Sequence, residues 1–151
     1  MIHLAEDFFA TKNDPRQISV TEEVMDRLRK IHPSALSEQD DGNGPVAWVL
    51  IIPTTKLLMT QFIEKQVSES EMLQNTPIPG KYEAVYLCSA LVLPEHRGRG
   101  IAKKLACDAI RNISKDHPIK SLFYWVFSAE GAKLASSIAG EVRLPLLNRQ
   151  E

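Results

Sequence analysis

The sequence has few of the residues that form disulfides, membrane spans or metal sites. It contains two cysteines, Cys88 and Cys107, which suit neither a disulfide framework nor a paired-ligand motif, so the expected compartment is a reducing cytoplasm. The longest unbroken apolar run, from Val46 to Ile52, stops at Pro53 and is far shorter than the roughly 20 residues of a membrane span. Four scattered histidines give no metal site. The sequence therefore predicts no membrane span and no metal.

An excess of charge of either sign is also missing. The 18 basic and 19 acidic side chains give a formal net charge of −1 at pH 7, so neither nucleic acid nor an anionic membrane surface is an expected partner. His3, Glu6 and Asp7 stand where an export signal would be basic and then apolar, so no such signal is expected. With 44% hydrophobic residues and 151 residues in all, we expect a single domain over residues 1–151.

The first half of the chain predicts two helices and one strand. Ser19 and Glu22, at capping-box spacing, precede an apolar face that ends at Pro33, which predicts a helix over about 20–31. Residues 37–44 are polar and acidic, which predicts a loop, and the β-branched run 46–52 predicts a buried strand. Pro53 is expected in the first turn of a helix. That helix has an apolar stripe of Leu57, Leu58, Phe62 and Val67, it ends near Ser68–Glu71, and residues 76–80 follow as a rigid connector.

The second half predicts strands that alternate with helices. The almost wholly apolar stretch 85–93 is typical of a central strand covered on both faces. A helix is expected from Ile101 to just before Pro118, and a second buried strand over 122–127. A further helix over 129–139 is expected to end on Gly140, with one strand around 142–146. This order predicts an α/β fold.

A basic turn with two glycines connects the central strand to its helix. A helix N-terminus has free N–H groups and the positive end of a dipole, so it favours phosphate. Gly98 and Gly100 remove side chains that would keep a phosphate from those donors. The positive side chains here are Arg97, Arg99, Lys103 and Lys104. Two glycines also suit any tight turn, and the spacing is neither that of a P-loop nor that of a dinucleotide fingerprint.

In its context, the turn resembles motif A of the GNAT acyltransferase superfamily. That motif is Gln or Arg, two residues, Gly, one residue, then Gly or Ala, directly after a strand that ends Val-x-Pro. Val92 and Pro94 match the strand end, and Arg97, Gly100 and Ala102 match the motif in register. The resemblance covers residues 83–140 and implies a GNAT-like mixed central sheet flanked by helices, with acetyl-CoA or another acyl-CoA as co-substrate.

The resemblance also implies roles for individual residues. The backbone of Leu91 and Val92 would pair with the pantetheine arm. The amides that would hold the pyrophosphate are those of Arg97, Gly98, Arg99, Gly100, Ile101 and Ala102. Ser128 stands where many relatives have an asparagine that touches the cofactor, although it is equally suited to cap the next helix.

Transfer of an acyl group to an amine needs a base and an acid. Glu83 and Tyr86 are candidate bases, and each also fits a structural role, as an exposed strand end and a packed aromatic. Relatives commonly carry a tyrosine that acts as the acid in the helix after the second strand, but alignment on Gly140 puts Ser136 at that position. Water or another residue, with Tyr124 as the candidate, would then have to serve as the acid, or transfer would be slow or absent. Cys88 as an acyl-accepting nucleophile is disfavoured, because a lone cysteine in an apolar run usually belongs to the core.

Two departures from the family pattern affect the acceptor side. Only residues 141–151 follow Gly140, which implies a shortened C-terminus, and the middle of the chain predicts one strand where relatives have a strand hairpin. A homodimer that completes the acceptor pocket is a hypothesis. We expect an N-acyltransferase acting on a small-molecule or peptide amine. The alternatives are a non-catalytic acyl-CoA-binding or sensing module and an interaction domain without a cofactor.

Overall fold

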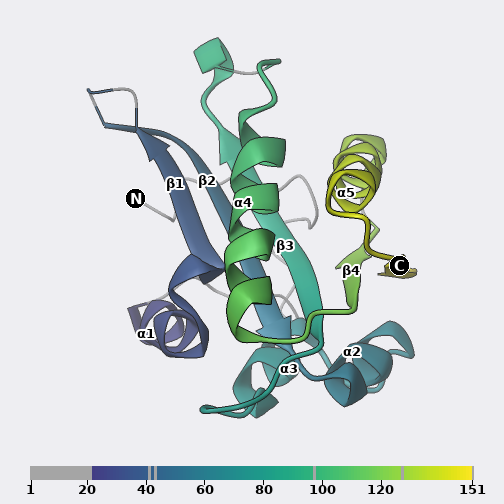
Figure 1. Ribbon diagram of the computed structural model, residues 1–151. Helices are drawn as coiled ribbons and strands as arrows, with labels where there is room; N and C mark the ends of the chain where they lie inside the picture. The colour runs from purple at the N-terminus through teal and green to yellow at the C-terminus, as the bar shows by residue number, and fades with distance from the viewer. Residues whose placement is uncertain (1–21, 41, 43, 97, 127, 151) are drawn as a thin grey trace.

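The computed structural model describes residues 22–40, 42, 44–96, 98–126 and 128–150. Its elements are α1 (Glu22–Ile31), β1 (Leu36–Asp40), β2 (Pro45–Thr54), α2 (Lys56–Ile63), α3 (Glu69–Asn75), β3 (Ala84–Val92), α4 (Ile101–Asp116), β4 (Ser121–Trp125), α5 (Ala129–Val142) and β5 (Leu146–Arg149). The strands form one five-stranded sheet in the order β1-β2-β3-β4-β5. The sheet is mixed, because β1, β2 and β3 are antiparallel neighbours whereas β4 and β5 run parallel to β3 (Figure 1). The predicted α/β fold with a mixed, helix-flanked sheet is confirmed.

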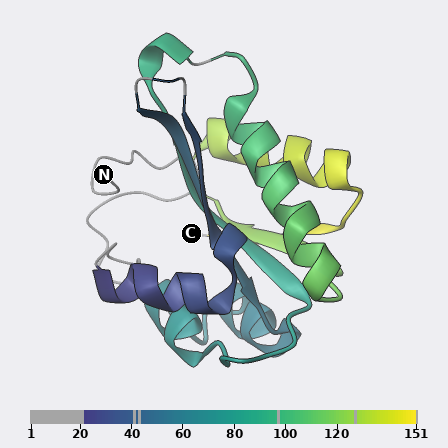
Figure 2. The same ribbon diagram turned by 60° about the vertical axis from the view of Figure 1, so that its left-hand side comes forward.

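β3 is the centre of the fold, and all nine of its residues are buried. Val85 and Leu87 belong to a core under α4 and α5, whereas Tyr86 and Cys88 belong to a second core with α1, α2 and α3. Figure 2 shows α4 and α5 on one side of the sheet and α1 on the other. A central strand that is covered on both faces has no polar face, which explains its continuous apolar sequence.

The predicted loop over 37–44 is wrong in its first half, because residues 36–40 form the edge strand β1. β1 pairs antiparallel with β2, so the middle of the chain does contain a strand hairpin, contrary to our expectation. Glu38, Gln39 and Asp40 are exposed. Charged side chains on an edge strand hinder pairing with other chains, and they give the strand the composition of a loop.

The predicted start of the second helix is also wrong. Pro53 lies inside β2, and α2 begins after Thr55, whose hydroxyl accepts a hydrogen bond of 3.2 Å from the backbone N–H of Leu58. The segment from Ser68, expected as the end of that helix, instead starts the separate helix α3. There the Ser68 hydroxyl accepts from the N–H of Glu71, and the Glu71 carboxylate accepts from the N–H of Ser68. This capping box defines the start of α3.

The C-terminal helix is longer than predicted. Gly140 lies within α5 rather than at its end, and Arg143 ends the helix in a left-handed conformation, at φ 60°. The last turn carries Glu141, which lies 3.7 Å from the Lys103 ammonium and 3.5 Å from the Arg111 guanidinium of α4. The following strand, β5, therefore begins at Leu146 instead of near residue 142. Phe127, in the predicted strand 122–127, lies outside the described residues.

Candidate functional site

The turn between β3 and α4 leaves the start of the helix open. Gly98 and Gly100 have positive φ angles, 82° and 72°, which residues with a Cβ rarely adopt. Gly100 is the N-cap of α4, and no side chain caps the helix there. A Cβ built at either glycine meets nothing within 4 Å. The first N–H groups of α4 therefore face open space that side chains at these two positions would enter.

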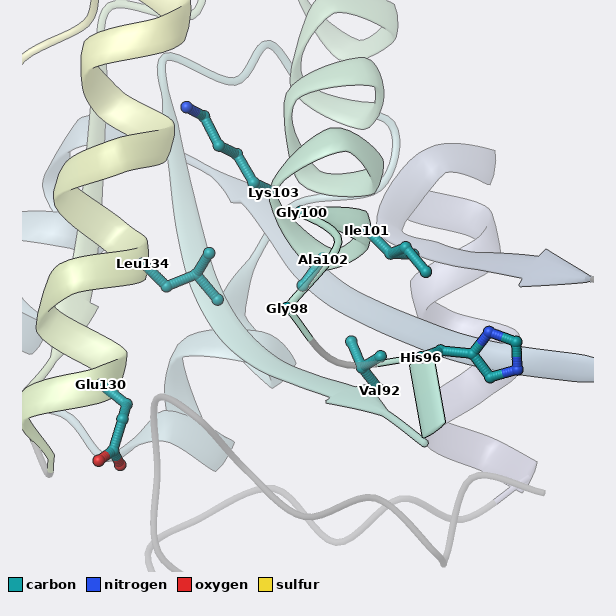
Figure 3. A pocket seen from close by; sticks show the side chains of 9 residues that line it. All are labelled: Val92, His96, Gly98, Gly100, Ile101, Ala102, Lys103, Glu130 and Leu134. Carbon is teal, nitrogen blue, oxygen red and sulfur yellow. The ribbon is translucent and has the colours of Figure 1, made fainter. Parts of the chain in front are cut away.

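A pocket of about 230 Å³ lies beside this turn. Its lining residues are Val92, His96, Gly98, Gly100, Ile101, Ala102, Lys103, Glu130 and Leu134. Figure 3 shows that Leu134 and Glu130 approach from α5, whereas Val92 and the first turn of α4 form the other side. The pocket therefore has an apolar wall along one part and free helix N–H groups along another.

The structure brings most of the predicted binding residues to this pocket. Val92 and the segment from Gly98 to Ala102 lie around it, but Arg99 is exposed beside it rather than in its lining. Leu91 is a buried neighbour on β3, at 5% exposure. Arg97 lies outside the described residues. Ser128 caps α5, where its hydroxyl accepts a 3.0 Å hydrogen bond from the N–H of Gly131.

Three residues that line the pocket were not predicted as binding residues from the sequence: His96, Glu130 and Leu134. Glu130 and Leu134 are four residues apart on α5 and share one helix face. That spacing is visible in the sequence, but the packing of α5 beside the start of α4 is a tertiary feature.

The sheet opens near the pocket. The pairing of β3 with β4 stops at Leu87 and Tyr124, although β3 continues to Val92. At the same level, the pairing of β3 with β2 shifts by one residue, so that Cys88 is the extra residue of a bulge. The bulge changes the face on which the following residues lie. Leu87 and Ala90, three positions apart, therefore belong to the same core, although residues at that spacing lie on opposite faces of a regular strand. Bulges of this kind often lie beside active sites.

The candidate catalytic residues lie at different places relative to this opening. Glu83 precedes β3 at the end farther from Val92, about 30 Å along the strand. Its carboxylate is 3.9 Å from the Lys120 ammonium. The structure therefore does not bring Glu83 to the pocket.

Tyr86 and Tyr124 lie at the opening, on opposite faces of the sheet. The Tyr86 hydroxyl donates to Glu69 Oε2. Burial, and then the charge of Glu69, raises the pKa of Tyr86 well above its usual 10.0. Tyr124 faces the α4 and α5 side, and burial raises its pKa as well. Both phenols are therefore protonated near neutral pH, which suits a hydrogen-bond donor or an acid better than a base.

Both cysteines are buried thiols that form no disulfide. In the part of the chain that the structure describes, no group of three or more potential ligands could hold a metal ion. None of the described helices is both long enough and apolar enough to cross a membrane.

A comparison with protein families extends beyond the segment that carries the glycine turn. The sequence model described as "Acetyltransferase (GNAT) family" matches residues 2–132. The search among curated proteins and the search among solved structures each found no match. The family match covers most of the chain, and it includes the hairpin, the opened sheet and the glycine turn. The chain therefore belongs to the GNAT acetyltransferase family.

Proposed function

We propose that this protein transfers an acetyl or other short acyl group from acyl-CoA to an amine, by direct attack of the amine on the thioester. The family is one of acyltransferases, which supports this class of reaction. The observation that carries the proposal is the open N-terminus of α4 beside a pocket whose glycines leave room for a ligand. This is the chemistry that a diphosphate needs, since backbone N–H groups and a helix dipole both favour anions.

The residues present fit acyl-CoA in two parts. The amides from Gly98 to Ala102 would hold the diphosphate, with Arg99 and Lys103 adding positive charge. Leu91 and Val92 lie on the strand that would run beside the pantetheine arm, where β4 has left the backbone edge of β3. Ser128 is better suited to its capping role, because its hydroxyl already accepts a hydrogen bond. The contribution of Arg97 remains a prediction.

Acyl-CoA would supply an activated thioester, and the protein's own residues would orient the substrates and move protons. Tyr124 is our candidate acid for the departing thiolate, because it lies at the opening and faces the pocket side of the sheet. No hydrogen bond between described residues involves its hydroxyl, which leaves that proton available. Tyr86 is proposed as a fixed donor rather than a base, since its hydroxyl already donates to Glu69. The distance of Glu83 from the pocket argues against it as the base.

The second candidate function is a non-catalytic acyl-CoA-binding or sensing module. It is favoured by Ser136, which is exposed on α5 and stands at the position where relatives have the tyrosine that acts as the acid. We further infer a cytoplasmic location and an acceptor that is a small-molecule or peptide amine. Whether a homodimer completes the acceptor side can be measured as the mass in solution.

Binding can be tested at Gly100. Gly100→Glu should weaken CoA binding in calorimetry by at least about 100-fold, or about 2.7 kcal/mol, because it places a negative charge where the diphosphate would lie. Gly100→Ala is the matched control. It imposes the same strained φ at a cost of roughly 1–2 kcal/mol and adds a methyl group but no charge, so it should weaken CoA binding clearly less than Gly100→Glu does.

The outcomes separate the candidates. Equal affinity of wild type and Gly100→Glu would rule out the proposed site. Absence of any CoA binding would leave only an interaction domain. Binding without thiol release from acetyl-CoA across a broad panel of amines would favour the sensing module over the transferase.

A further inference from the structure

A buried carboxylate lies on the face of β3 opposite the pocket. Glu69, the first residue of α3, is 2% exposed. Its Oε2 accepts a hydrogen bond from the Tyr86 hydroxyl, and the Cys88 Sγ lies 3.8 Å from the same oxygen. Burial of a carboxylate is unfavourable unless hydrogen bonds or opposite charges compensate. An acid kept in such a place is a candidate for a functional group.

The position of this carboxylate coincides with the opening of the sheet. Tyr86 and Cys88 flank Leu87, the last residue of β3 that pairs with β4. Cys88 is also the extra residue of the bulge. From Val92, at the pocket, the strand runs only about 13 Å back to Cys88. A thioester that follows the open edge of β3 from the pocket would thus come close to Glu69.

Charged and titratable groups on two strands lie beside the pair of Glu69 and Tyr86. On β3 they are Tyr86 and Cys88, and from β5 the charge of Arg149 also acts on the Tyr86 hydroxyl, where it opposes the charge of Glu69. Arg149 is 4% exposed, and its guanidinium lies over the rings of Phe62 and Trp125, 4.6 and 4.5 Å from their centroids. Tyr86 stabilises the ionised form of the carboxylate as a donor that keeps its own proton.

We propose that Glu69 is the base that accepts the proton of the acceptor amine. This inference rests on the proposed transferase function. In this proposal the amine would approach the opening from the face opposite the cofactor pocket, and it is an ammonium ion until a base deprotonates it. The Cys88 thiol lies farther from Oε2, at 3.8 Å, than the Tyr86 hydroxyl does, and we expect an ammonium group to take the place of the thiol there.

The protons and bonds balance as follows. The ammonium group gives one proton to the Glu69 carboxylate, and the freed lone pair forms the bond between nitrogen and the acyl carbon while the bond between carbon and sulfur breaks. The leaving sulfur takes a proton from the Tyr124 hydroxyl. The second proton of the nitrogen then passes to the Tyr124 oxygen, so that Tyr124 returns to its protonated form. Glu69 then releases its proton to solvent. The products are the amide, CoA as a thiol and one proton.

The test is the pH dependence of kcat/KM in wild type and in Glu69→Gln, with acetyl-CoA and the alkylamine that wild type acetylates fastest. The amide of glutamine is isosteric and still accepts from Tyr86. In wild type, kcat/KM should be nearly constant between about pH 7 and 9, because a carboxylate and an ammonium ion are the reacting forms. In Glu69→Gln it should fall at least about 100-fold at pH 7 and recover about tenfold per pH unit, as free amine becomes available.

Two further variants complete the comparison. Glu64→Gln, an exposed glutamate at the end of α2, should keep the wild-type profile. Glu83→Gln tests the rival base and should also keep it. A purely structural role of Glu69 would lower kcat/KM by the same factor at every pH, which would overturn the proposal.

The wild-type profile tests the inference even where Glu69→Gln does not fold. A wild-type kcat/KM that rises tenfold per pH unit over the whole range would show that no base acts, and the proposal would fail. Absence of transfer by wild type to any amine would overturn the transferase function, and the role of Glu69 with it. Transfer by wild type with an unchanged profile in Glu69→Gln would overturn the role of Glu69 alone.

Discussion

Tyr124 differs from the other buried tyrosines in what surrounds its hydroxyl. Tyr82 donates a 2.6 Å hydrogen bond to the carbonyl of Pro77, and Tyr86 donates to Glu69. Tyr124 instead lies at the last pair between β3 and β4, on the side of α4 and α5. Its raised pKa keeps the phenol protonated through the neutral range. A protonated phenol next to the opening can serve as an acid, whereas the hydroxyls of Tyr82 and Tyr86 are already engaged.

We therefore expect Tyr124→Phe to lower kcat by about 100-fold or more, the usual effect of removing a positioned acid. The affinity for CoA, measured by calorimetry, should change by less than about twofold, because phenylalanine keeps the packing. Tyr82→Phe is the control. It should cost about 1 kcal/mol of stability through the lost hydrogen bond to Pro77 and leave kcat unchanged. An unaltered kcat in Tyr124→Phe would remove this residue from the mechanism.

The residues of the glycine turn could be predicted from sequence because their roles are local. The strand end, the two glycines and the helix start are neighbours in the chain, and the positive φ angles of Gly98 and Gly100 follow from the turn itself. Glu69 and Leu134 could not be predicted in this way. Each reaches the site from another helix, and the packing that brings it there does not appear in a local pattern.

At the scale of elements, α3 shows why short helices escape prediction. It has seven residues, and their composition reads as a polar segment between two hydrophobic ones. What defines it is the capping box of Ser68 and Glu71, together with the burial of Met72 and Leu73. A helix this short has little stability of its own, so its caps and its packing decide whether it forms. The same helix carries Glu69.

Ser68→Ala should therefore cost about 1 kcal/mol of the free energy of unfolding, since the N–H of Glu71 loses its acceptor. The measurement is the midpoint of urea unfolding. Ser70→Ala lies two residues further, inside the same helix, and should leave the midpoint unchanged or raise it slightly, because alanine favours helices. Equal midpoints for Ser68→Ala and Ser70→Ala would show that the capping box does not stabilise the fold.

A strand that is buried along its whole length could be predicted from the sequence, whereas a partly exposed edge strand could not. β3 is buried along its whole length and is continuously apolar, so its sequence identifies it. β1 lies at the edge of the sheet, and its exposed Glu38, Gln39 and Asp40 resemble a loop. The prediction that Pro53 starts a helix is wrong for a related reason. Proline is common at helix starts, but its position in β2 is set by the pairing with Val85 of β3.

On the scale of the whole molecule, the sheet separates two different environments. The face under α4 and α5 borders the pocket and is packed with aliphatic and small side chains. The opposite face holds an aromatic cluster, in which the Phe62 ring lies 4.9 Å from Tyr86 and 5.7 Å from Trp125 between ring centroids. Glu69 and Arg149 are buried on that side. The two faces of the sheet at the opening thus differ in polarity.

The buried titratable groups on both faces predict how the stability of the molecule depends on pH. The pKa values of Tyr82, Tyr86 and Tyr124 are raised from 10.0 in the folded state, with burial as the largest cause in each case. Above about pH 10 the unfolded chain therefore binds fewer protons than the folded one, and the free energy of unfolding falls as the pH rises. Burial lowers the pKa of His117 from 6.5, so stability also falls as the pH drops below about 6.5.

Urea midpoints should accordingly be highest between about pH 7 and 9.5 and decrease on both sides. Tyr86→Phe should flatten the alkaline decrease more than Tyr124→Phe, because Tyr86 is fully buried beside an acid and its pKa is raised further. Comparison with wild type at each pH isolates the substituted phenol, because every other titratable group is the same in the proteins compared. An alkaline decrease of equal steepness in wild type and Tyr86→Phe would show that the Tyr86 phenol is not desolvated in solution, and that Glu69 does not lie beside it.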